Sequence, residues 1–290
     1  MLEQSVIYPP RDGYPFYITA KRYWISGQPM FDPNGPDTMT LLLLHGTGFH
    51  KETWEPSIER IFDLTLHGDG ILKIREAWAI DCPNHGASAQ LNESALQQPA
   101  LRHNCEVHLS ISPNAPFMLL VVTCEKYATA VHHFLLAGRD HGAKVDFRQR
   151  NLVGVAHSLG GVSMLAKLYV QLIIDWQYSR AILQNLEPKI KFSSVILVEP
   201  LLSPGGKEHV YSLRKRLVRS AYERRDVWPS REDAFQSLKM KTSWHPRVIE
   251  LFVVKISTKS ARWDCLSCKS NRNMHLGSTL PHTQTRRILD

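Results

Sequence analysis

Hydrophobic residues along this chain fall into short continuous runs that alternate with stretches of helical periodicity. Apolar runs without a polar alternation are typical of parallel strands buried on both faces. Such runs predict strands at residues 39–44, 74–80, 152–156 and 193–198, and a segment rich in β-forming residues predicts an edge strand at 16–25. Helical spacing predicts helices at 54–66, at 123–138 and from Val162 onward. The alternation predicts an α/β fold with a doubly wound, mostly parallel sheet.

The same pattern divides the chain into four parts. Residues 1–37 form an N-terminal extension that begins with a turn-rich segment and contains the edge strand. Residues 38–200 form the α/β core, in which the polar stretch 87–116 is expected to be a loop over the sheet. Residues 201–254 are charged and helix-forming, and they predict a helical cap. Residues 255–290 are a basic, polar tail without apolar periodicity, which we expect to be disordered.

A serine stands where one buried strand gives way to a helix. Residues 152–161 read Leu-Val-Gly-Val-Ala-His-Ser-Leu-Gly-Gly, so Ser158 lies between the small residues Ala156 and Gly160. Small residues at these positions let strand and helix approach closely and leave the serine hydroxyl above the sheet. The Leu159 N–H would lie at the helix N-terminus, where an oxyanion could form. This pattern predicts a nucleophile elbow with Ser158 as the nucleophile.

The elbow pattern is G-x-S-x-G, and Ala156 occupies its first position. Alanine adds one methyl group, which is tolerated where glycine serves mainly for clearance. The alternative is that Gly160 and Gly161 open an ordinary helix in a nucleotide-type α/β sheet. The remaining motifs favour the elbow.

A glycine-rich loop follows the strand at 39–44. Residues 45–50 read His-Gly-Thr-Gly-Phe-His, and glycines allow a backbone to aim its N–H groups inward. Such a loop can aim a second N–H at the point where that of Leu159 points, and Thr47 is the candidate for this second oxyanion donor. The alternative is a tight glycine turn without a functional role.

Acidic groups follow two other predicted strands. Glu199 comes directly after the strand at 193–198, at the edge where doubly wound sheets hold functional groups. It is the candidate acid that orients a catalytic histidine, and the alternative is that it caps the following turn. Asp81 and His85 follow the strand at 74–80, and we interpret both as structural because that turn needs polar groups to satisfy its backbone.

Composition narrows the function classes. No apolar run approaches the roughly 18 residues of a membrane helix, and the absence of a secretory or C-terminal peroxisomal signal predicts an intracellular, cytoplasmic protein. The five cysteines are an odd number at uneven spacings, which favours reduced thiols. Cys265 and Cys268 lack a second pair, so we predict no metal and no cofactor. Of the net charge of +8, +5 lies in residues 255–290, so nucleic acid is not the expected partner.

Taken in order, these motifs resemble the α/β-hydrolase superfamily, and in particular fungal serine hydrolases related to toxin biosynthesis and peroxisomal lipases. The resemblance rests on residues 45–56, 81–86, 152–161, 198–200 and 244–248, and it covers about residues 10–254. It implies a Ser-acid-His hydrolase without a cofactor, acting on a small-molecule ester or lipid-like acyl substrate through an acyl-enzyme. Ser158 would be the nucleophile and Glu199 the acid, with the Thr47 and Leu159 amides as oxyanion donors.

The chain departs from that family after Val254. The catalytic histidine should follow a last strand, but residues 255–290 contain no recognisable strand and only two histidines, His275 and His282. A second hypothesis is therefore a hydrolase-like protein that lacks the histidine and binds a ligand or partner without turnover. A third, weaker hypothesis is that the tail binds an anionic surface or nucleic acid.

Overall fold

The computed structural model describes the N-terminal two thirds of the chain most fully. The described residues are 1–11, 14–27, 32, 34–68, 70–97, 118–139, 142–165, 190–200, 228–241, 246 and 249–250. The predicted tail at 255–290 and most of the predicted cap at 201–254 lie outside them. Within the cap segment the structure describes one helix, α8 (Arg231–Lys241).

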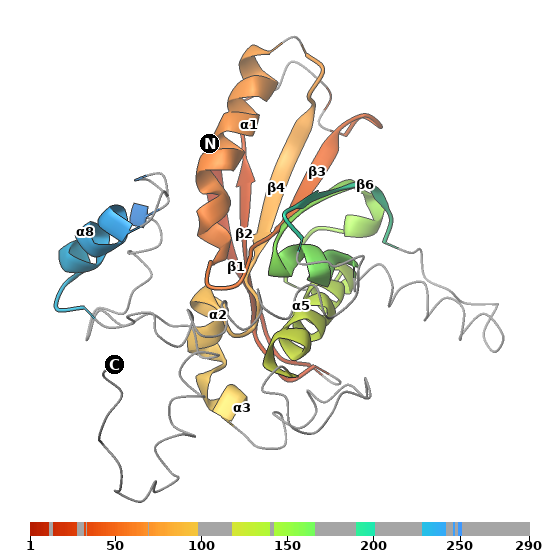
Figure 1. Ribbon diagram of the computed structural model, residues 1–290. Helices are drawn as coiled ribbons and strands as arrows, with labels where there is room; N and C mark the ends of the chain where they lie inside the picture. The colour runs from red at the N-terminus through yellow and green to blue at the C-terminus, as the bar shows by residue number, and fades with distance from the viewer. Residues whose placement is uncertain are drawn as a thin grey trace, which may run out of the picture.

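A six-stranded sheet in the order β1-β2-β4-β3-β5-β6 forms the centre of the molecule (Figure 1). Its strands are β1 (Leu2–Tyr8), β2 (Ile18–Trp24), β3 (Met39–Leu44), β4 (Ile74–Ile80), β5 (Asn151–His157) and β6 (Phe192–Val198). Strands β4, β3, β5 and β6 are parallel, whereas β1 and β2 are antiparallel to their neighbours. The mostly parallel sheet is thus confirmed.

Sequence predicted the four parallel strands to within one residue at each end, because each contains several apolar residues close together. A strand, β2, forms within the predicted segment 16–25, but the prediction that it lies at the edge of the sheet is wrong. β2 lies between β1 and β4, and β1 is the edge. In β1 only Val6 and Tyr8 are buried, so its sequence carries little hydrophobic pattern.

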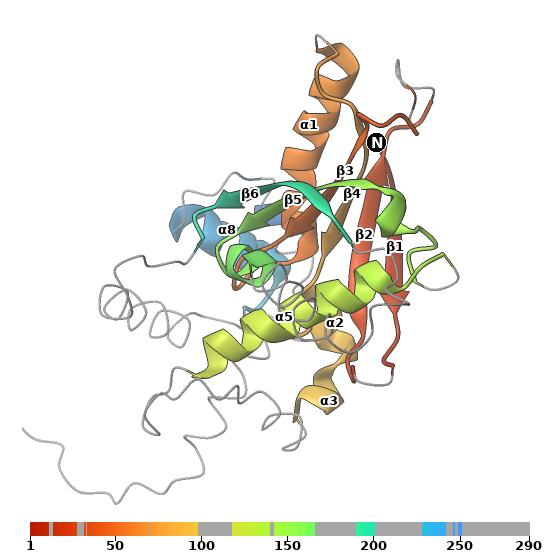
Figure 2. The ribbon, with the colours of Figure 1, turned by 90° about the vertical axis from the view of Figure 1, so that its right-hand side faces the viewer.

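Helices cover both faces of the sheet. They are η1 (Lys51–Trp54), α1 (Glu55–His67), α2 (Gly86–Leu91), α3 (Glu93–Gln97), α5 (Met118–Leu136) and η2 (Phe147–Gln149), and a further helix spans 159–165 after β5. α1 lies on one face and α5 on the other (Figure 2). The predicted helices at 54–66 and 123–138 are confirmed, although α5 begins five residues earlier than expected. The predicted loop at 87–116 is wrong in its first part, which forms α2 and α3.

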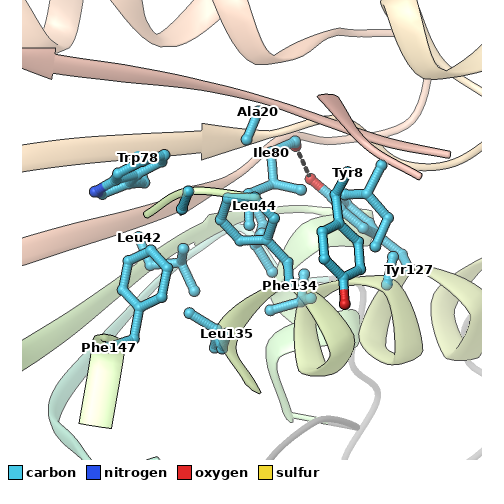
Figure 3. Close-up of a cluster of buried hydrophobic side chains, with 14 of the residues drawn as sticks. Tyr8, Ala20, Leu42, Leu44, Trp78, Ile80, Tyr127, Phe134, Leu135 and Phe147 are labelled. Carbon is cyan, nitrogen blue, oxygen red and sulfur yellow. Dashed lines mark hydrogen bonds between the residues drawn. The ribbon is translucent and has the colours of Figure 1, made fainter. Parts of the chain in front are cut away.

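Two hydrophobic clusters hold these layers together. The larger cluster packs α5 against one face of the sheet and includes Leu42, Leu44, Trp78 and Phe134 (Figure 3). The smaller cluster packs α1 against the opposite face, where alternate residues of the same strands point. Both faces of the central strands are therefore buried, as expected for parallel strands with helices on both sides. Within the described residues, no helix is both long and apolar enough to traverse a bilayer.

Phe134 lies at the centre of the larger cluster, so truncating its side chain should destabilise the fold measurably. Its ring is fully buried and its centroid lies 5.7 Å from those of Trp78 and Phe147. We expect Phe134→Ala to lower the free energy of unfolding by about 3–5 kcal/mol, because it leaves a cavity. Urea unfolding measures this loss. The half-exposed Leu64 of α1 provides the control, and a Phe134→Ala loss as small as that of Leu64→Ala would contradict the packing described.

Candidate active site

Ser158 forms a sharp elbow between β5 and the helix at 159–165. Its φ is +49°, a left-handed conformation that few residues other than glycine adopt. The Ser158 N–H donates to the Val198 carbonyl of β6 at 3.0 Å, and its own carbonyl accepts from the Val162 N–H at 3.3 Å. The strand therefore ends and the helix begins within one residue. The helix starts at residue 159, three residues before the expected start at Val162.

The elbow packs against the backbone at the end of β3. A Cβ atom at Gly160 would lie 2.5 Å from the Leu44 carbonyl oxygen and 2.8 Å from that of His45. No side chain fits in this space, so glycine is required for the helix to approach the strand. The prediction that small residues permit this approach agrees with the geometry.

The loop after β3, residues 45–50, lies directly over the elbow, and we call it the β3 loop. A Cβ atom at Gly46 would lie 3.2 Å from the Ser158 Cβ and 2.8 Å from the His157 Nδ1. Gly46 to Phe49 form a turn closed by the Phe49 N–H and the Gly46 carbonyl at 3.2 Å. Gly48 has a φ of +79°, which favours glycine at the third position of such a turn.

The predicted oxyanion donors are the backbone N–H groups of Thr47 and Leu159. Within the described part of the chain, the Thr47 N–H has no acceptor, whereas those of His45, Gly48 and Phe49 are used. The Leu159 N–H belongs to the first helical turn, where N–H groups have no intrahelical partner. The two predicted donors belong to the β3 loop and to the start of the helix after β5, two segments that come together where Gly46 approaches Ser158.

Glu199 follows β6 at the same edge of the sheet. Its φ is +45°, so it shares the left-handed conformation of Ser158, and the preceding residue Val198 binds the Ser158 N–H. Its side chain is 87% exposed, and one carboxylate oxygen lies 3.9 Å from the His157 Nε2. Glu199 is thus close to the elbow. Its carboxylate is exposed to solvent rather than buried inside the turn.

The catalytic histidine is not identified among the described residues. No described histidine accepts a hydrogen bond from the Ser158 hydroxyl, and His275 and His282 lie outside the described residues. His157 is next to Ser158 in sequence, but its ring packs against Phe49, with the centroids 6.0 Å apart. Sequence analysis did not single out His157.

A buried polar cluster lies beneath the β3 loop. Asp81 is fully buried; its carboxylate accepts from the Lys51 N–H at 2.8 Å, the Lys51 Nζ at 2.6 Å and the Ala87 N–H at 3.1 Å. Burial alone would raise the pKa of Asp81, but the charge and hydrogen bond of Lys51, together with His45, outweigh burial and lower it. Asp81 therefore satisfies its own turn, as predicted, and also fixes the end of the β3 loop.

The described residues contain no group of three or more potential metal ligands. Cys265 and Cys268 lie outside the described residues.

The close approach at Gly160 predicts an unusually costly alanine substitution. Gly160→Ala should lower the free energy of unfolding by more than about 2 kcal/mol, because its methyl group would meet two backbone carbonyls. Gly70→Ala is the matched control, since Gly70 has open space around it but a φ of +77°, and it should cost only about 1 kcal/mol. Chemical denaturation of both variants measures the difference. Equal losses would argue against a tight contact between the elbow helix and β3.

The described geometry agrees with the similarities of this chain to known proteins. A model of the alpha/beta hydrolase family matches residues 41–280, and so extends beyond Val254, where the resemblance was expected to end. The type I acyl-CoA thioesterase mpaH of Penicillium brevicompactum is 28% identical over 211 residues, which cover 71% of this chain and 36% of that protein. The mpaH protein of Penicillium roqueforti is 26% identical over 228 residues, covering 75% of this chain and 40% of the relative. The chain thus spans less than half the length of these relatives.

Solved structures share the fold. The peroxisomal alpha-beta-hydrolase Lpx1 from Saccharomyces cerevisiae superposes with a TM-score of 0.57 at 17% identity, covering 92% of this chain and 65% of Lpx1. A thioesterase domain from the curacin biosynthetic pathway superposes with a TM-score of 0.51 at 14% identity, covering 94% of this chain and 73% of that domain. The family model covers most of the chain, and the sheet order and the elbow agree with it: this chain belongs to the alpha/beta hydrolase family.

Proposed function

We propose that this protein is a serine hydrolase that cleaves a carboxylic ester or lipid-like acyl substrate, with Ser158 as the nucleophile. The observation that carries the proposal is the left-handed conformation of Ser158 at the end of β5. Strain of this kind costs on the order of 1–3 kcal/mol and is concentrated at functional sites. Here it lies at a serine between a strand and a helix, and a nucleophile elbow of this kind is typical of acyl transfer.

The reaction would proceed in two steps. The Ser158 Oγ attacks the substrate carbonyl carbon while a histidine takes its proton, and the Thr47 and Leu159 N–H groups stabilise the oxyanion. The intermediate collapses as the C–O or C–S bond breaks, and the histidine returns its proton to the leaving alcohol or thiol. Water then attacks the acyl-enzyme, which releases the carboxylic acid and regenerates Ser158.

Glu199 is the proposed acid that orients this histidine. It lies at the carboxyl end of β6, next to the strand that carries Ser158, and Val198 connects the two directly. Its exposed carboxylate is accessible to a histidine from another segment of the chain. His275 and His282 are the candidates for this histidine. The family model matches the chain up to residue 280, which supports His275.

The substrate class follows from the elbow and is supported by the relatives. A serine nucleophile forms an acyl-enzyme, so the bond cleaved is an ester or thioester. The mpaH proteins are named acyl-CoA thioesterases, which supports an acyl substrate.

Ser158→Ala should abolish hydrolysis of p-nitrophenyl acetate, butyrate and octanoate by the purified protein. Loss of the nucleophile in such enzymes reduces kcat by about 10⁶-fold. Ser5→Ala, at an exposed position of β1, is the control and should leave the rate unchanged. Equal activity in Ser158→Ala and wild type would reject Ser158 as the nucleophile.

Glu199→Gln should lower kcat by about 10³–10⁴-fold with little change in KM, because the amide cannot hold the histidine in the required tautomer. Steady-state kinetics with the best of the three esters measures this. Glu93→Gln in α3, which removes an exposed carboxylate elsewhere, should not change kcat. If the kcat of Glu199→Gln also matched that of the wild type, Glu199 would have no catalytic role and would only cap the turn after β6.

A second candidate function is binding of an acyl ligand without turnover. The observation that favours it is that His275 and His282, the two histidines after Val254, follow no recognisable strand. A folded wild-type protein that binds the octanoate ester but does not hydrolyse it would select this candidate over the first.

A further inference from the structure

We propose that His85 and His45 are positioning residues, which fix the Thr47 N–H by crossed hydrogen bonds between the β3 loop and the turn after β4. We call the latter, residues 81–86, the β4 turn. This inference rests on the proposed function, because it concerns the donor assigned there to the oxyanion. It goes beyond the sequence interpretation, in which His85 served only its own turn.

Each of the two segments donates a backbone N–H to an imidazole of the other. The Gly48 N–H of the β3 loop donates to the His85 Nε2 at 3.0 Å. The Cys82 N–H of the β4 turn donates to the His45 Nε2 at 3.0 Å. Both imidazoles are buried, with exposed fractions of 1% for His45 and 2% for His85. The contacts are therefore shielded from water and from salt.

The hydrogen bonds define one tautomer for each ring. Because each Nε2 accepts, each Nδ1 carries the proton. The His45 Nδ1 then donates to the Gly46 carbonyl at 2.9 Å, and the His85 Nδ1 donates to the Asn84 Oδ1 at 2.7 Å. Burial, together with the neighbouring His85, lowers the pKa of His45 to about 3. His45 is thus neutral at physiological pH, as its role of acceptor requires.

Other contacts fix the two ends of the β3 loop. At its start the His45 N–H donates to the Tyr127 hydroxyl of α5 at 3.2 Å, and this hydroxyl donates to the Ile80 carbonyl of β4 at 2.6 Å (Figure 3). Just past its end the Lys51 N–H donates to Asp81 at 2.8 Å. From the β4 turn, His85 reaches the middle of the loop through its hydrogen bond to Gly48.

Gly48 is adjacent to the proposed oxyanion donor. Its N–H belongs to the planar peptide that also contains the Thr47 carbonyl, so the bond to His85 fixes the plane that follows Thr47. The Gly46 carbonyl, held by the His45 Nδ1, lies in the peptide that contains the Thr47 N–H itself. The two histidines therefore fix the peptide planes on both sides of the Thr47 Cα. A freed loop would leave the donor poorly aimed.

Replacing His85 by Asn and by Gln separates this role from general packing. The amide of Gln extends about as far as the His85 Nε2, so its oxygen can still accept from Gly48. The amide of Asn ends near the position of Nδ1 and cannot reach it. Loss of an oxyanion donor costs about 10²–10³-fold in kcat, and a misaimed donor should cost part of that. We expect His85→Asn to lower kcat by about 10–100-fold with KM nearly unchanged, and His85→Gln to stay within about threefold of wild type.

Hydrogen–deuterium exchange across residues 45–50 gives a second readout that needs no activity. Exchange of the β3 loop should be faster in His85→Asn than in wild type, and His85→Gln should restore slow exchange. His67→Asn, at the exposed end of α1, is the control and should change neither quantity.

The outcomes separate this inference from the proposed function. If His85→Asn leaves both kcat and exchange as in wild type, the positioning role is wrong. If Asn and Gln reduce kcat and accelerate exchange equally, the effect is loss of packing and the role is again wrong. A wild-type protein that hydrolyses no ester overturns the proposed function, while the exchange data still decide whether His85 holds the loop.

Discussion

The first turn of the helix after β5 packs directly on the backbone at the end of β3, and the geometry of the site depends on this contact. Gly160 allows it, because a Cβ there would lie 2.5 Å from the Leu44 carbonyl oxygen. With the helix this close, the chain has to reverse within one residue, which forces Ser158 to a φ of +49°. The serine side chain then lies beneath Gly46 and beside the end of β6. The positions of the elbow and of the β3 loop therefore depend on each other and on the order of the strands.

Such a site stores strain, and a rigid surrounding structure must offset it. Ser158 and Glu199 both adopt left-handed conformations, each of which costs on the order of 1–3 kcal/mol. The compensation comes from the sheet, buried on both faces, and from the polar cluster below the β3 loop. In that cluster Asp81 and Glu52 raise the pKa of Lys51 against the effect of burial, so the ion pairs stay charged. Fully satisfied buried networks of this kind rigidify the segments that they join.

Sequence predicted the parts of this arrangement that leave a periodic or local pattern. The parallel strands are rich in apolar residues, and the elbow needs small residues at fixed offsets from Ser158, so both could be predicted from the sequence. β1 was missed because only one side of its end is buried. The crossed histidine bonds were missed because they join residues 37 positions apart, and no spacing marks such pairs. The position of the base was not predicted, because neither His275 nor His282 follows a recognisable strand.

The most direct test of the account is covalent labelling of the folded protein with a fluorophosphonate, followed by mass spectrometry of its tryptic peptides. Such reagents react with a serine whose hydroxyl is activated by a base and whose oxyanion is stabilised, whatever the natural substrate. The account predicts a single adduct in the peptide of residues 151–167, with fragment ions that assign it to Ser158 rather than Ser163. A folded protein that forms no adduct, or forms it at another serine, would contradict the claim that Ser158 is an activated nucleophile.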